Sequence, residues 1–185
     1  MIQVSKEEYV IILDFLPNGY PFDLHSSFRK GPIAQALSKT NFTLLEVIPK
    51  QGVQLQPAEE VYIGEGKRDK IHHVVGRIGA EKLTQTAQGE LEFVVKKLVL
   101  DQPQQYINFF NKAGPISTRM HQIELLPGIG KKHMWEILEA REEKPFESFE
   151  DIKNRVRLIP DPLKSIIKRI LMEINNEDKY KIFVR

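Results

Sequence analysis

The sequence contains no cysteine and a single tryptophan among its 185 residues. The absence of cysteine excludes disulfides, thiolate metal sites and a cysteine nucleophile. No run of 18 apolar residues is present, so we expect neither a transmembrane helix nor a membrane partner. The first residues also lack the basic and apolar regions of a secretory signal, which predicts a cytoplasmic protein.

Motifs that accompany catalysis are missing as well. The chain has no P-loop, no G-x-S-x-G and no H-E-x-x-H sequence. The five histidines are scattered: His25, His72, His73, His121 and His133. His72 and His73 are adjacent, and on a regular strand their rings would face opposite sides and could not share a metal. We therefore expect no enzyme activity, no cofactor and no metal held by side chains.

Composition is ordinary for a globular protein, with 41% apolar and 28% charged residues. The length suits one large domain or two small ones. The formal net charge is only +2, but the segment 153–169 carries six basic residues against Asp161 alone, a local charge of 6 − 1 = +5. Such a stripe can contact phosphates. It can equally be the solvated face of two amphipathic helices.

The first 80 residues show short apolar runs separated by turn residues. Four runs rich in β-branched residues predict strands: residues 9–15, 42–48, 61–63 and 71–78. The piece 33–37, after Gly31 and Pro32, is interpreted as a short helix. Four or five strands at this spacing are typical of a small barrel or curled sheet.

Candidate nucleic-acid contacts in this region are Tyr62, Lys67, Arg68, His72, His73 and Arg77. An aromatic ring could stack on a base while Lys67 and Arg68 follow the phosphates. The alternative is that Tyr62 packs in the core and that Lys67 and Arg68 form an ordinary exposed turn.

The pattern changes after residue 80. Apolar residues three or four apart predict a helix over 81–100 and a second helix that includes 106–110. Pro103 fits the first turn of this second helix. We expect a helical neck over 81–114 that joins an N-terminal domain (1–80) to a C-terminal domain (115–185).

The most informative stretch is 125–132, which reads LLPGIGKK. Apolar residues at helical spacing precede it (Ile116, Met120, Ile123, Leu126) and follow it (Met134, Ile137, Leu138), which predicts a helix on each side. Glycine permits positive φ and close approach of a ligand. The first N–H groups of the helix after Gly130 lack partners within the helix and suit an anion. We predict a backbone phosphate clamp made by Gly128, Ile129, Gly130, Lys131 and Lys132. The alternative is a turn that only joins two packed helices.

The pattern recurs 33 residues later, where 158–164 aligns with 125–131. Asp161 and Leu163 replace the two glycines, and Pro162 removes an N–H donor. The second turn is therefore expected to be structural, with Asp161 as N-cap and Pro162 as first residue of the next helix. Lys164, Lys168 and Arg169 on that helix are candidate side-chain contacts to phosphate.

The segment from Pro115 to about Ile174, which contains both turns, resembles the helix-hairpin-helix family of nucleic-acid-binding modules. The blocks 144–146 and 149–152 belong to the same resemblance. The chain as a whole resembles an archaeal family of uncharacterised proteins. The resemblance implies an α+β chain: a small OB-like β-barrel followed by an all-α tandem helix-hairpin-helix domain with a degenerate second hairpin. It also implies phosphate binding without sequence preference and, in some members, a monovalent cation on hairpin carbonyls, here within Pro127–Gly130.

We therefore expect a non-enzymatic protein that binds DNA or RNA with low sequence specificity, because phosphate contacts carry no sequence information. The alternative function is a protein-interaction scaffold or accessory subunit of a nucleic-acid-processing complex. That function would use Trp135 with Phe146 and Phe149 as a docking surface. The alternative for Trp135 is a structural role, in which it is partly buried against the connector between the hairpins.

Overall fold

The computed structural model describes residues 6–21 and 31–185. His25 and the first five residues lie outside the described part. Two compact units can be distinguished: residues 1–94, 174–177 and 183–185 form the sheet unit, and residues 95–173 and 178–182 form the helical unit. The expected neck, 81–114, is divided between them. None of the helices within 6–21 and 31–185 has the length and apolar character needed to span a membrane.

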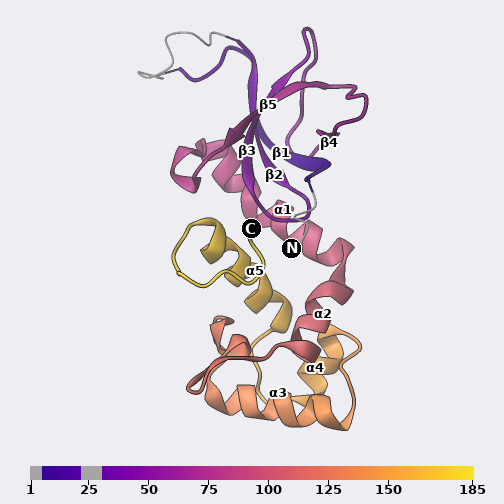
Figure 1. The fold of residues 1–185 in the computed structure, drawn as a ribbon, viewed down its shortest axis with the longest axis vertical. Helices are drawn as coiled ribbons and strands as arrows, with labels where there is room; N and C mark the ends of the chain where they lie inside the picture. Colours follow the sequence, from indigo (N-terminus) through magenta and orange to yellow (C-terminus); the bar gives the residue numbers. More distant parts are fainter. Residues whose placement is uncertain (1–5, 22–30) are drawn as a thin grey trace. The chain divides into compact units, whose positions relative to one another are not determined.

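The sheet unit is built on five antiparallel strands that curl into a half-barrel (Figure 1). Their order across the sheet is β4-β1-β2-β3-β5. The strands are β1 (Tyr9–Leu16), β2 (Ile33–Ser38), β3 (Leu44–Pro49), β4 (Glu60–Tyr62) and β5 (Ile71–Arg77). The prediction of strands is confirmed, but the short helix predicted over 33–37 is wrong. All six residues of β2 are buried, so the strand lacks the polar alternation that would have revealed it.

A helix is fixed to this sheet by a buried polar side chain. Gln35 is fully buried, and its Nε2 donates to the Lys82 carbonyl at 2.8 Å while its Oε1 accepts from the Thr84 N–H at 2.9 Å. Thr84 Oγ1 donates to Asp14 at 2.5 Å. These bonds satisfy groups that would be costly to bury unpaired. They hold the 3₁₀ turn η1 (Ala80–Lys82) and the start of α1 (Gln85–Asp101) against β1 and β2.

The chain returns to the sheet unit at residues 183–185. The Arg185 N–H donates to the Asn41 carbonyl at 3.1 Å, and Thr43 Oγ1 donates to the Arg185 carbonyl at 2.7 Å. The helical unit is therefore an insertion in the path of the sheet unit.

The helical unit follows α1 in a fixed order: α2 (Pro103–Lys112), β6 (Pro115–Ser117), β7 (Met120–His121), η2 (Gln122–Leu125), α3 (Lys131–Glu143), α4 (Phe149–Arg155) and α5 (Pro162–Ile174). Helices α3 and α5 begin after Gly130 and Asp161, as the sequence predicts, and α2 begins at Pro103, which the sequence places in the first turn of that helix. The helix predicted to lead into 125–132 is wrong. A two-stranded hairpin, in which Pro115 of β6 pairs with His121 of β7, and the 3₁₀ turn η2 occupy that segment instead.

Candidate functional site

The first turn (residues 125–131) is shaped by one glycine with positive φ. Gly128 has φ +83°, a conformation that other residues adopt at a cost. The Ile129 N–H donates to the Leu126 carbonyl at 3.1 Å, and both side chains are buried. Helix α3 then begins at Lys131, and its first helical hydrogen bond runs from the Met134 N–H to the Gly130 carbonyl at 2.9 Å.

The amino end of α3 is open in a way that the following helices are not. Ser148 caps α4 and Asp161 caps α5 with a side-chain oxygen. Gly130 gives α3 no such bond, and the first turn of α3 has no acidic residue. A Cβ at Gly130, which has φ −97°, would meet nothing within 4 Å of the described chain. Packing therefore does not require glycine here, and the missing side chain leaves the helix-start amides uncovered on that side.

The two lysines that follow Gly130 differ. Lys131 Nζ pairs with Glu124 at 3.2 Å and donates to the Arg119 carbonyl at 3.0 Å. The His121 N–H, and then Lys131, hold the pKa of the Glu124 carboxyl below its usual range. Lys132 is exposed and has no hydrogen bond or ion pair within the described chain. Lys132 is thus the available cation beside the open amides, and Lys131 is partly neutralised.

Donors from α5 reach two carbonyls of the first turn. Ser165 Oγ donates to the Pro127 carbonyl at 2.9 Å, and Arg169 Nη1 donates to the Leu125 carbonyl at 3.1 Å. The Leu126 carbonyl already accepts from Ile129. Ser165 therefore gives a donor to the Pro127 carbonyl, one of the hairpin carbonyls within Pro127–Gly130 where the resemblance implied a monovalent cation. Sequence reasoning missed Ser165, because only the fold brings it to the turn.

The second turn (residues 158–164) has the N-cap that its sequence predicts. Asp161 Oδ1 accepts from the Lys164 N–H at 3.2 Å, so the carboxylate caps α5. The Pro160 ring lies against Gly128: a Cβ placed on Gly128 would come within 3.2 Å of the proline Cγ. The two turns thus interlock, and only the first offers unoccupied helix-start amides.

The basic stripe is smaller than the sequence predicts. Arg169 is 1% exposed and paired with buried Glu173 at 2.9 Å, so its prediction as a surface phosphate contact is wrong. Arg155 bonds to Asp151 and to the Lys144 carbonyl, and it lies 4.6 Å from the Phe146 ring. Lys153 lies 3.8 Å from Glu150. The residues of the stripe that stay exposed without a partner in the described chain are Arg157, Lys164 and Lys168.

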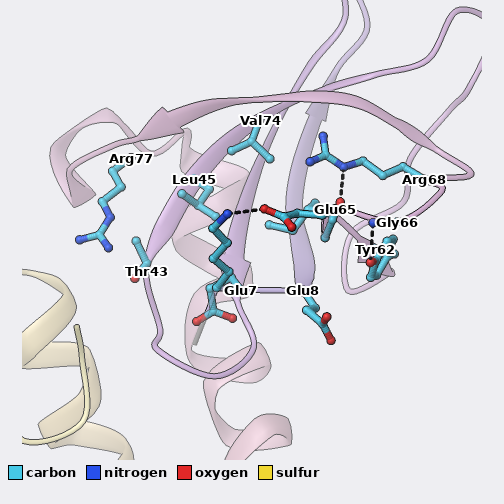
Figure 2. A pocket seen from close by; sticks show the side chains of 13 residues that line it. Glu7, Glu8, Thr43, Leu45, Tyr62, Glu65, Gly66, Arg68, Val74 and Arg77 are labelled. Carbon is cyan, nitrogen blue, oxygen red and sulfur yellow. Dashed lines mark hydrogen bonds and ion pairs between the residues drawn. The ribbon is translucent and has the colours of Figure 1, made fainter. Parts of the chain in front are cut away.

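The sheet unit carries a cavity of about 580 Å³ at its open side. Figure 2 shows Arg68 and Arg77 on opposite sides of the cavity lining, with the apolar side chains of Leu45 and Val74 between them. Arg68 Nε donates to the Gly64 carbonyl at 2.8 Å. Tyr62 is half-buried and also lines a second cavity of about 550 Å³, where exposed Lys67 lies. Acidic residues of the first cavity, such as Glu65, offset its basic side chains.

The prediction that His72 and His73 face opposite sides of a strand is wrong. The register of β5 against β3 shifts between the pairs Ile48–His73 and Pro49–Ile71, which makes a bulge at His72. A bulge turns two successive side chains toward one side, and the two Nδ1 atoms lie 2.8 Å apart. The described residues nevertheless include no cluster of three or more residues able to ligate a metal.

We expect His121 to make the helical unit sensitive to mild acid. Its Nδ1 accepts the Ile123 N–H at 3.2 Å, and burial, with Arg141 nearby, lowers the pKa of the ring. A lowered folded-state pKa gives stability that is complete above the unfolded value of about 6.5 and is lost as pH falls through the folded value. We expect H121N, which keeps a cap acceptor without a titrating ring, to flatten the fall in melting temperature between about pH 7 and pH 5. Parallel curves for wild type and variant would contradict this.

The chain was then compared with known proteins. Residues 6–185 match the family described as "Protein of unknown function (DUF655)". The chain belongs to this family. A DUF655 crystal structure, Af1531 from Archaeoglobus fulgidus, is 46% identical and has a TM-score of 0.86, with 97% of this chain and 100% of that chain covered. The uncharacterized protein MJ0038 of Methanocaldococcus jannaschii is 46% identical over 181 residues, which are 97% of this chain and 80% of that protein. The DUF655 relatives are thus archaeal, as the resemblance implied, and the mixed α+β fold is shared.

Proposed function

We propose that this protein is a non-catalytic nucleic-acid-binding protein that holds a phosphate of one strand at the amino end of α3. The observation that carries the proposal is the uncapped start of α3 at Gly130. Free N–H groups and the positive end of the helix dipole stabilise an anion there. The helix-hairpin-helix resemblance of the same residues supports nucleic acid as the source of the phosphate.

The surroundings of the turn support a phosphate ligand over a carboxylate of the protein itself. Lys132 is exposed beside the amides, and exposed Lys164 and Lys168 lie on α5, whose Ser165 contacts the turn. Each phosphate that a cation neutralises releases counterions, so affinity should fall as salt rises. The OB-like interpretation of the half-barrel adds Lys67 and Arg68 as contacts of the sheet unit, independent of the turn.

The sharpest test is G130D. Aspartate is a better N-cap than glycine, so the variant should unfold at an equal or slightly higher temperature. Its carboxylate would occupy the amides and repel phosphate. We expect G130D to bind nucleic acid at least about tenfold more weakly and to lower the slope of log affinity against log salt by about one. Fluorescence anisotropy with labelled oligonucleotides at several salt concentrations measures both quantities.

The matched control is G89D on α1. Gly89 is exposed, and a Cβ there also meets nothing within 4 Å. The change in charge and residue type is identical, but Gly89 belongs to the sheet unit and is no part of the turn. G89D should bind like wild type. Undiminished binding by a folded G130D would refute the clamp.

A further inference from the structure

Trp135 is the only tryptophan in the chain, and 65% of it is exposed on α3. Single exposed apolar residues are common on protein surfaces. The position of this one sets it apart, because it lies in the turn of α3 that follows the open amides. The alternative, partial burial against the connector, leaves most of Trp135 exposed, whereas Phe146 in that connector is buried.

The indole shares a helix face with the two lysines. Trp135 follows Lys131 by four residues and Lys132 by three, and residues at these spacings are neighbours on a helix surface. Helical side chains lean toward the amino end, so the indole covers the turn before it. Four residues correspond to about 6 Å along the helix axis. The ring is therefore within one nucleotide of a phosphate held at the amides.

The same face becomes acidic beyond the indole. Glu139 and Glu142 are exposed and follow Trp135 by four and seven residues. Their charge repels phosphate on that side, whereas the amides and Lys132 attract it on the other. A strand bound here would thus have its phosphate toward Gly130 and an uncharged part over the ring.

We propose that Trp135 is a stacking platform for an unpaired nucleobase whose neighbouring phosphate is held at the start of α3. This inference rests on the proposed function and narrows its ligand to single-stranded nucleic acid or the unpaired part of a folded RNA. Every base has a π-face, so an aromatic platform binds single strands without sequence preference. A base inside a duplex is stacked on its neighbours and does not reach the ring.

The test compares wild type, W135A and W135F on unstructured DNA and RNA oligonucleotides and on a duplex of equal length. We expect W135A to weaken single-strand binding by about 5- to 150-fold and duplex binding by less than about twofold. W135F should keep most of the single-strand affinity. Because Trp135 is the only tryptophan, an unlabelled single strand should also quench the intrinsic fluorescence of wild type.

The outcomes separate the two proposals. If G130D loses affinity while W135A does not and no quenching occurs, the stacking platform is refuted and the phosphate clamp stands. If W135A weakens single strands and duplex equally, the ring is not a base platform. A response of the tryptophan to a protein partner but to no oligonucleotide would also refute it. Equal melting temperatures of the three proteins, expected for an exposed side chain, exclude a folding defect.

Discussion

Replacing Glu173 with alanine should lower the free energy of unfolding by about 3–5 kcal/mol, the range measured when one partner of a buried ion pair is removed. Glu173 is fully buried and Arg169 is 1% exposed, with Nε and Oε1 2.9 Å apart. E173A leaves the buried guanidinium without its closest counter-charge. It also removes the acceptor of the Ile182 N–H, which lies 2.8 Å from the same oxygen.

The rest of the Arg169 network limits the loss but does not prevent it. Asp178 lies 3.0 Å from Nη1, and the Tyr180 carbonyl lies 2.6 Å from Nη2. The Tyr180 N–H, and then Arg169, hold the pKa of the Asp178 carboxyl below its usual range, so Asp178 stays ionised at neutral pH. Asp178 is partly exposed, however, and solvent screens its attraction for the guanidinium.

Urea unfolding followed by circular dichroism measures the effect of E173A. The control is E150A, which removes an exposed partner 3.8 Å from Lys153 and should cost less than about 1 kcal/mol. The double variant R169M/E173M should recover only the part of the loss that comes from the uncompensated charge, because it still leaves the Ile182 N–H without its acceptor. An E173A protein as stable as E150A would show that the pair is dispensable.

G128A should destabilise the protein by about 2–5 kcal/mol, for two separate reasons. A left-handed conformation costs a non-glycine residue about 1–2 kcal/mol, and Gly128 has φ +83°. The new Cβ would also lie 3.2 Å from Pro160 Cγ and 3.4 Å from Pro160 Cβ, and overpacking costs about 1–3 kcal/mol. The variant should bind nucleic acid more weakly too, because the turn that presents the α3 amides is displaced.

A double-mutant cycle separates the two causes. P160A removes the ring that the new methyl group meets but leaves φ unchanged, so G128A/P160A should regain only the packing part of the loss. G130A is the matched control: Gly130 is extended and open, and alanine there should cost about 1 kcal/mol or less, as for an N-cap change. If G128A cost no more than G130A, the interlocked turns would not be a source of stability.

The predicted strands and helix starts came from signals that are local. The run 9–15 is apolar and β-branched, and Asp161 followed by Pro162 is an N-cap with its first helical residue, so both could be identified without knowing their neighbours. The lead-in to the first turn failed because apolar residues three apart fit a 3₁₀ turn as well as an α-helix. Ile123 and Leu126 have that spacing, and both are buried at η2.

The candidate site was predictable in its backbone and not in its surroundings. The order proline, glycine, apolar residue, glycine and lysine indicates open amides at a helix start. The pairing of Lys131 with Glu124 and the cover that Ser165 gives to Pro127 depend on segments brought together by the fold. Arg169 did leave a signal: it lies three residues after Ile166 and four before Glu173, on the buried face of α5.

The return of the chain to the sheet unit has a consequence for the order of folding. The bond between Thr43 and Arg185 spans 142 residues, and closing so long a loop in an unfolded chain costs entropy before any contact repays it. The helical unit consists of residues 95–173 and 178–182, all of which lie between the two ends of the sheet unit. We expect that unit to form first, after which the loop to be closed is mostly folded chain. The rate at which the sheet is completed would then depend on the stability of the helices inserted within it. A sheet that forms as fast in E173A as in wild type would contradict that order.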